Sequence, residues 1–105
     1  MVETVSQIPL LFPITVQVAA GATRVISFPD EFLGYAVSLL VQNEDGANAA
    51  TIRIGGASQA ALNVPASAFR TWDNVDIKLI EIVAGAGGVT IVQAQLRQRI
   101  GVETQ

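Results

Sequence analysis

The chain of 105 residues contains neither histidine nor cysteine. It therefore lacks the commonest general base, the thiol nucleophile and two of the best transition-metal ligands, and it can form no disulfide. Lys78 is its only lysine, so a serine or threonine nucleophile has almost no activating base available. We therefore predict a protein that is not an enzyme, with no catalytic residues, no cofactor and no metal ion.

Charged side chains are scarce as well. They make up 14% of the residues, against about 25% in an average soluble domain, while 50% of the residues are apolar. A small domain with so little charge has apolar surface to cover, which predicts a homo-oligomer or docking onto a larger body. The net charge is −3, and the few basic residues are scattered, so we expect no nucleic-acid partner. These basic residues are Arg24, Arg53, Arg70, Lys78, Arg97 and Arg99.

Long hydrophobic runs are also missing. The apolar stretch from Ile8 to Val18 contains Pro9 and Pro13 and is shorter than the 18 or so residues that a membrane span needs. Glu3 stands where a secretion signal would carry a basic residue. We expect neither membrane association nor a secretion signal.

Alternation of apolar and polar residues is the dominant pattern of the chain. Between Ile8 and Val18 every second residue is apolar, and the two prolines fall in the other phase, which predicts a strand at the edge of a sheet. Similar short runs, separated by Gly, Pro and Asn/Asp turns, predict an all-β, two-layer β-sandwich of about eight short antiparallel strands, for which the jelly roll is one arrangement. We expect a single domain at residues 8–98, with tails at 1–7 and 99–105. The other expected strands are 23–28, 35–42, 49–54, 60–64, 68–72, 75–83 and 89–97.

The connections carry their own signals. Pro29 begins and Gly34 ends an expected helical turn, because glycine suits the left-handed residue that terminates a helix. Gly46 in Asn-Glu-Asp-Gly predicts a hairpin from strand 35–42 to strand 49–54. The apolar residues in both phases of 35–42 predict a central strand covered on both faces. We also expect a turn at 73–74, a flexible hairpin linker at 85–88 and a bulge near Ile91.

Acidic residues occur in three pairs, Asp30/Glu31, Glu44/Asp45 and Asp73/Asp76. Paired carboxylates can hydrolyse glycosides, and loop carboxylates can bind calcium. Each pair falls in an expected turn, however, where Asp hydrogen-bonds to nearby backbone, and the spacing matches no calcium-binding loop. We interpret all three pairs as turn chemistry.

Contacts between copies are expected along the first strand and around the single tryptophan. Leu11 lies in the polar phase of that strand and is expected to be exposed. Trp and Arg are the residues found most often at interface hot spots. Trp72 fits either the rim of the core or such an anchor. The predicted interface residues are Leu11, Pro13, Arg70, Trp72 and Arg97.

Four segments of the second half form a pattern similar to that of small all-β virion proteins of tailed bacteriophages. The segments are 51–56 (TIRIGG), 62–65 (LNVP), 72–77 (WDNVDI) and 87–92 (GGVTIV). The sequence departs from the pattern after Pro65, where Ala66 replaces glycine. The resemblance implies a structural protein of the virion, of the capsid-decoration or minor structural type, assembled in the host cytoplasm.

Three functions follow from the sequence. The first is a non-enzymatic capsid decoration or cement protein that binds the phage shell, through a major capsid or other virion protein, as a homo-oligomer. The alternative is a tail-associated or cell-surface module that binds a glycan through Trp72. An enzyme using Asp73 and Asp76 is the third, and the missing residue types disfavour it.

Overall fold

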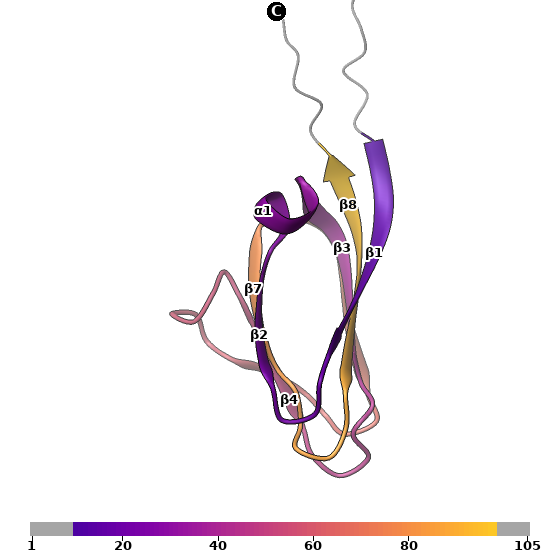
Figure 1. The fold of residues 1–105 in the computed structure, drawn as a ribbon, viewed down its shortest axis with the longest axis vertical. Coiled ribbons are helices and arrows are strands. Elements are labelled where there is room, and N and C mark those ends of the chain that lie inside the picture. The colour runs from indigo at the N-terminus through magenta and orange to yellow at the C-terminus, as the bar shows by residue number, and fades with distance from the viewer. Residues whose placement is uncertain (1–9, 99–105) are drawn as a thin grey trace, which may run out of the picture.

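A computed structural model of the protein describes residues 10–98. Two antiparallel sheets of four strands each face one another (Figure 1), which confirms the all-β, two-layer β-sandwich. Both expected tails, together with Ile8 and Pro9 of the expected first strand, lie outside the described residues. Sheet A has the strand order β1 (Leu10–Val18), β8 (Thr90–Gln98), β3 (Gly34–Asn43), β6 (Phe69–Ile77). Sheet B has the order β2 (Thr23–Ser27), β7 (Leu79–Val83), β4 (Ala50–Ile54), β5 (Leu62–Val64).

Strand pairing is nested along the chain. β1 pairs with β8, β2 with β7, β3 with β6 and β4 with β5, all antiparallel. The pairing of β1 with β8 runs without a break from Leu10 opposite Gln98 to Val18 opposite Thr90. The first and last described residues are therefore neighbours at one end of the sandwich (Figure 1).

The core fills the space between the sheets with the inward phase of each strand. In β1 the predicted alternation is confirmed: Phe12, Ile14, Val16 and Val18 point inward, and Val18 is fully buried. The inward phase of β8 is equally regular and also as predicted. The buried apolar residues of the other strands include Ile26, Leu39, Val41, Ile52, Ile80, Ile82, Val92 and Leu96.

One short helix, α1 (Phe28–Phe32), closes the end of the sandwich near the start of β1 and the end of β8 (Figure 1). Phe28, expected to end a strand, instead begins this helix and is completely buried. The prediction that Gly34 supplies the left-handed residue is wrong: Leu33 does so, with φ 61°, and Gly34 starts β3. The Leu33 N–H caps the helix by donating to the Pro29 carbonyl at 3.1 Å. Among residues 10–98, no helix is long and apolar enough to cross a membrane.

The expected hairpins are wrong. Both β3–β4 and β7–β8 pass from one sheet to the other, so neither connection joins paired neighbours. Gly46 consequently needs no positive φ and has none. The 85–88 segment is not a hairpin linker, because it joins β7 of one sheet to β8 of the other, and its glycines pack closely against Asp45 and Asn48. A Cβ at Gly88 would lie 2.7 Å from the Asp45 Cα, so only glycine fits this close approach.

Two irregularities differ from those expected. β6 runs through 73–74 without ending, and Asn74 adopts a left-handed conformation with φ 56° inside it. The register against β3 shifts between Ala36 and Ser38, where β6 has extra residues, which is the signature of a β-bulge. Ile91 lies in continuous register with Gln17, so the bulge predicted there is wrong.

Candidate functional site on the outer face and edge of sheet A

The outer face of sheet A carries the side chains that alternate away from the core. Strand register arranges them in rows that run across all four strands. No described element covers this face, so the prediction that β3 is covered on both faces is wrong; Tyr35 and Leu40 are only half-buried. One row is Thr15, Gln93, Leu40 and Thr71; the next is Pro13, Gln95, Ser38 and Asp73. The flanking rows are Gln17, Ile91, Gln42 and Phe69 on one side and Leu11, Arg97 and Tyr35 on the other.

These rows are chemically unusual for an exposed surface. Amides and hydroxyls predominate in the two central rows, which also contain Leu40 and Pro13, and Asp73 and Arg97 are the only charged residues of the rows. The large apolar side chains that are exposed, Leu11 at 53% and Phe69 at 63%, stand in the outermost rows. The two central rows are therefore mostly polar with little charge, whereas the outer rows mix polar side chains with exposed apolar ones.

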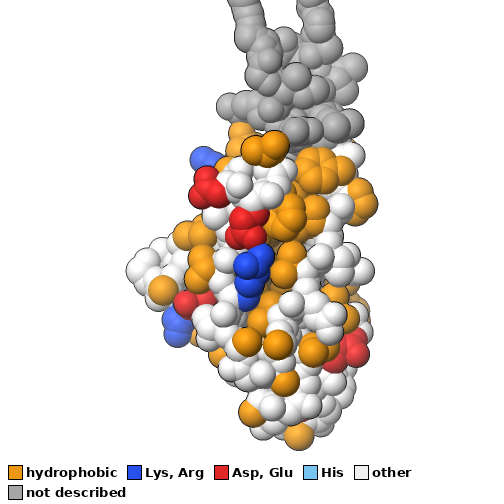
Figure 2. Space-filling view, in the orientation of Figure 1, with side chains coloured by type: hydrophobic (Ala, Val, Ile, Leu, Met, Phe, Trp, Pro, Cys, Tyr) orange, Lys and Arg blue, Asp and Glu red, His pale blue; other side chains and the backbone are white. Residues whose placement is uncertain are grey.

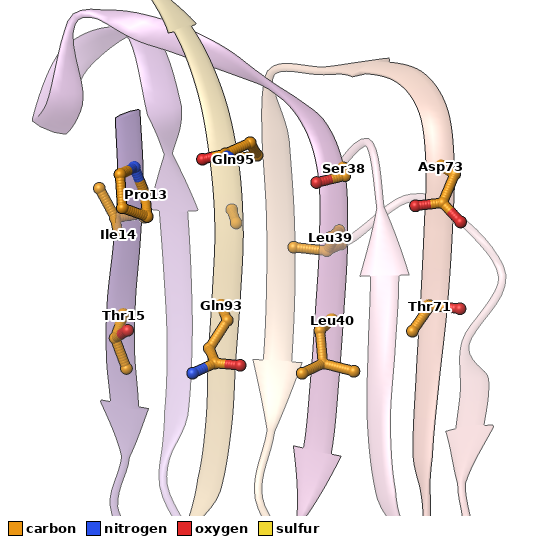
Figure 3. A pocket seen from close by; sticks show the side chains of 11 residues that line it. Pro13, Ile14, Thr15, Ser38, Leu39, Leu40, Thr71, Asp73, Gln93 and Gln95 are labelled. Atoms are coloured by element: carbon orange, nitrogen blue, oxygen red, sulfur yellow. The ribbon is translucent and has the colours of Figure 1, made fainter. Parts of the chain in front are cut away.

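Two adjoining hollows open on this face. The first, of about 350 Å³, extends across the four strands from β1 to β6, with the Gln93 and Gln95 side chains of β8 in it (Figure 3). The second, of about 460 Å³, lies over the bulge and includes Asn74 and Arg97. Ser38 and Asp73 line both hollows. The register shift and the small Ser38 side chain explain why the surface dips at this point.

The β1 edge is the least protected edge among the described strands. β5 has three residues and β2 has five, and β6 is interrupted by the bulge and carries Arg70, Asp73 and Asp76. β1 has nine residues and no charged side chain. Short length, bulges, charges and proline residues are the usual protections against edge pairing. Of these, β1 has only Pro13. The side of the molecule drawn in Figure 2 shows hydrophobic side chains at the surface, with charged ones in small separate groups.

The predicted interface residues divide into two sets. Leu11, Pro13 and Arg97 lie together on the outer face of sheet A. Arg70 and Trp72 lie in the other phase of β6, opposite Val41 and Leu39. Their role in contacts between copies stays a prediction.

Trp72 is half-buried and packs against the core. This is the core-rim position that its pattern allowed. The alternative that Trp72 binds a glycan stays a prediction.

Two of the three carboxylate pairs serve local structure, whereas Asp73 and Asp76 lie within strand β6, so the turn predicted for that pair is wrong. Asp30 accepts from the Ser27 hydroxyl at 2.8 Å, and Glu31 accepts from the Arg24 guanidinium at 2.6 Å. In β6, Asp73 and Asp76 are both exposed. Within residues 10–98 no three Asp or Glu side chains come close enough to hold a metal ion.

Asn43 and Asp45 tie together the three loops at the end of the sandwich opposite α1. The Asn43 amide donates to the carbonyl oxygens of Asn48, Val64 and Pro65, and its Oδ1 accepts from the Asp45 N–H. The Asp45 carboxylate accepts from the backbone N–H groups of Ala47, Asn48 and Gly87 and from the Asn48 amide. Asp45 is 3% exposed. Hydrogen bonds from Ala47, Asn48 and Gly87 stabilise the charged form and lower the pKa of Asp45 from 3.8 to about 2.

Acid should weaken this loop end. Because the pKa of Asp45 is lowered by folding, the stability that it contributes is complete above pH 3.8 and is lost as the pH falls through about 2. The thermal midpoint of the parent protein should therefore fall more steeply in this range than that of Asp45→Asn, which has no proton to bind. Melting curves recorded by circular dichroism from pH 5 to pH 2 measure the difference. Parallel curves for the two proteins would show that Asp45 does not carry the effect.

Sequence reasoning missed the glutamine rows and the Asn43 network. The alternation placed Gln17, Gln93 and Gln95 on the solvent side, but polar residues there carry no signal of a surface until the strand order is known. Asn43 resembles any turn asparagine, since its partners Val64 and Pro65 are about twenty residues away.

The fold and its surfaces define a small β-sandwich module. The fold is similar to that of a solved chain described by the words "Bacillus endospore appendages form a novel family of disulfide-linked pili". The TM-score is 0.61 and the identity 13%, over 96% of this chain and 99% of that chain. No family model matches the chain, and no curated protein matches it. At this identity the likeness shows a shared fold alone.

Proposed function

We propose that the protein is a non-enzymatic structural subunit that assembles with copies of itself. The observation that carries the proposal is the uncharged, nine-residue edge strand β1. The low content of charged residues, 14%, and a fold shared with a chain from a pilus support it. An open edge is a template for another strand, so a second copy can extend sheet A by backbone pairing.

The backbone of β1 carries N–H groups that can donate hydrogen bonds to a strand of a second copy. Pro13 has no N–H, yet it stands in unbroken register opposite Gln95. Opposite residues of an antiparallel pair alternate between hydrogen-bonded and non-hydrogen-bonded pairs, so we place Pro13 and Gln95 in a non-hydrogen-bonded pair, in which the backbone groups of Pro13 point away from β8. Residues in the same phase, Leu11, Thr15 and Gln17, then direct their N–H groups outward. These donors are the groups that a neighbouring copy would pair.

No disulfide can link the copies in such an assembly, since the chain has no cysteine. In this respect it differs from the neighbour, which is described as disulfide-linked. A reducing agent should therefore leave the assembly intact, whereas a denaturant should disperse it.

The setting that we propose first is the phage particle, with the subunit decorating the head shell by binding a major capsid protein or another virion protein. The virion-like segments of the second half support this setting. A filament subunit is the second candidate, and the fold of the pilus chain favours it. Electron microscopy of the purified protein separates the two, because a decoration protein forms discrete oligomers that bind isolated shells, whereas a filament subunit forms fibres unaided.

The edge is tested by two substitutions at one position. Gln17→Pro removes an outward N–H from β1, while Gln17→Ala changes the side chain and keeps the N–H. We expect light scattering to give a mass above 11.0 kDa for the parent and for Gln17→Ala, and a shift to monomer for Gln17→Pro. Circular dichroism checks that each variant is folded. A monomeric parent that binds no shells would contradict the proposed function. Equal assembly of both variants would exclude the β1 edge as the contact.

A further inference from the structure

We propose that the adjoining hollows on the outer face of sheet A bind a neutral carbohydrate. The site is centred on Ser38 and Asp73, which line both hollows, with Gln93 and Gln95 across the first (Figure 3). This proposal does not rest on self-assembly. Edge pairing along β1 extends the sheet in its own plane and leaves the outer face open.

The hydrogen-bonding groups of the site are available to a ligand. Each glutamine amide offers two donors and a carbonyl acceptor, Ser38 offers a hydroxyl, and the Asp73 carboxylate offers acceptors. In the part of the chain that the structure describes, Gln93, Gln95, Ser38 and Asp73 make no side-chain hydrogen bond to one another. A sugar presents vicinal hydroxyl groups that both donate and accept, and this mixture matches such a set.

The apolar contacts in the first hollow are modest. Pro13 and Leu40 line it beside the glutamines, and they can cover the C–H face of a sugar ring. Small-ligand sites usually have mainly apolar walls with a few convergent polar groups, and because these hollows are more polar than that, hydrogen bonds would have to supply most of the binding. Because no aromatic ring lines either hollow, we expect weak binding by a single copy.

Charge selects among polar ligands. One carboxylate, Asp73, and one guanidinium, Arg97, border the second hollow, so its formal charges cancel. A polyanion would meet the Asp73 carboxylate without a cluster of basic residues to offset it. A neutral oligosaccharide carries no charge for the Asp73 carboxylate to repel.

A protein partner fits this face less well. Protein interfaces are apolar at the centre and polar at the rim. The two central rows of this face are mostly polar, with Leu40 and Pro13 as their apolar members, and the exposed Leu11 and Phe69 stand in the outer rows, so the face has no apolar centre of that kind.

The test begins with a glycan array that carries neutral and anionic oligosaccharides. The best neutral oligosaccharide is then titrated into isotopically labelled protein and followed by NMR. We expect the side-chain amide signals of Gln93 and Gln95 to shift, and the affinity to fall by about tenfold or more in Gln95→Ala and Asp73→Ala, since each removes a hydrogen-bonding partner. Asn63→Ala, on the exposed β5 strand of sheet B, is the matched control and should bind like the parent.

Three results would overturn the site: no neutral oligosaccharide bound on the array, binding confined to anionic glycans, or unchanged affinity in Gln95→Ala and Asp73→Ala. Light scattering on the same samples reports assembly separately. Loss of the sugar site therefore cannot be mistaken for failure to assemble, nor the reverse.

Discussion

Phe28→Ala is expected to lower the free energy of unfolding by roughly 3–5 kcal/mol, the usual cost of truncating a buried phenylalanine. Phe28 is completely buried where β2 passes into α1, and its ring lies 6.4 Å from that of Phe32. Removing the ring leaves a cavity at the end of the sandwich, where Phe28 is the only residue of the short helix that is fully buried. Urea unfolding followed by fluorescence of Trp72, the only tryptophan, measures the loss.

Phe69→Ala makes the same chemical change at an exposed site and serves as the control. The Phe69 side chain is 63% exposed on β6, so its removal should change the stability by no more than about 0.5 kcal/mol. Equal losses in the two variants would contradict the assignment of Phe28 to the core.

Asn43→Ala is the second substitution with a large expected effect. Asn43 is almost completely buried, and its removal takes the amide donor from the Val64 carbonyl oxygen and the side-chain acceptor from the Asp45 N–H, whereas the Pro65 carbonyl oxygen keeps the Ala68 N–H as a donor. Each unsatisfied buried group costs about 1–3 kcal/mol, so a loss of roughly 3 kcal/mol in the free energy of unfolding is expected. Thermal unfolding and urea titration both measure it.

Asn63→Ala is the control for this substitution, because Asn63 is exposed on β5. A local effect should also appear in hydrogen exchange. The N–H groups of Asp45 and Ser67, which lie in the loops that Asn43 joins, should exchange faster in Asn43→Ala. Unchanged stability and unchanged exchange in these loops would show that the network is not needed to hold this end of the sandwich.

The strands could be predicted because alternation is a local signal. β1 shows this clearly: its inward residues from Phe12 to Val18, its edge position and the exposure of Leu11 all followed from the sequence. The same rule placed Val92, Ala94 and Leu96 of β8 inside.

The connections were harder to predict, since their geometry depends on which strand is the partner. Gly46 and the glycines of 85–88 were interpreted as hairpin residues because neighbouring strands usually pair. Here the chain changes sheet at both places. Gly88 is required by close approach to Asp45, a residue more than forty positions away, and no local pattern contains that information.

The candidate carbohydrate site also depends on strand pairing, so no local sequence pattern could predict it. Ser38 and Asp73 come together only through the β3–β6 register and its bulge, and Gln95 joins them through the β3–β8 register. The sequence marked Asp73 as a turn residue and Trp72 as the glycan contact, and the structure places the polar hollow on the opposite face of the strand from Trp72.

The pairing of Leu10 with Gln98 has a practical consequence for engineering. Because the two ends of the described chain are adjacent strands, a short linker could join them and new termini could be opened in an exposed loop, as circular permutation requires. The 55–61 loop, which projects from the body of the sandwich in Figure 1, is a suitable place to cut. Leu10 and Gln98 both lie at one pole of the molecule, away from the loops that Asn43 and Asp45 hold, so cargo attached at these two positions would start from the same end of the sandwich.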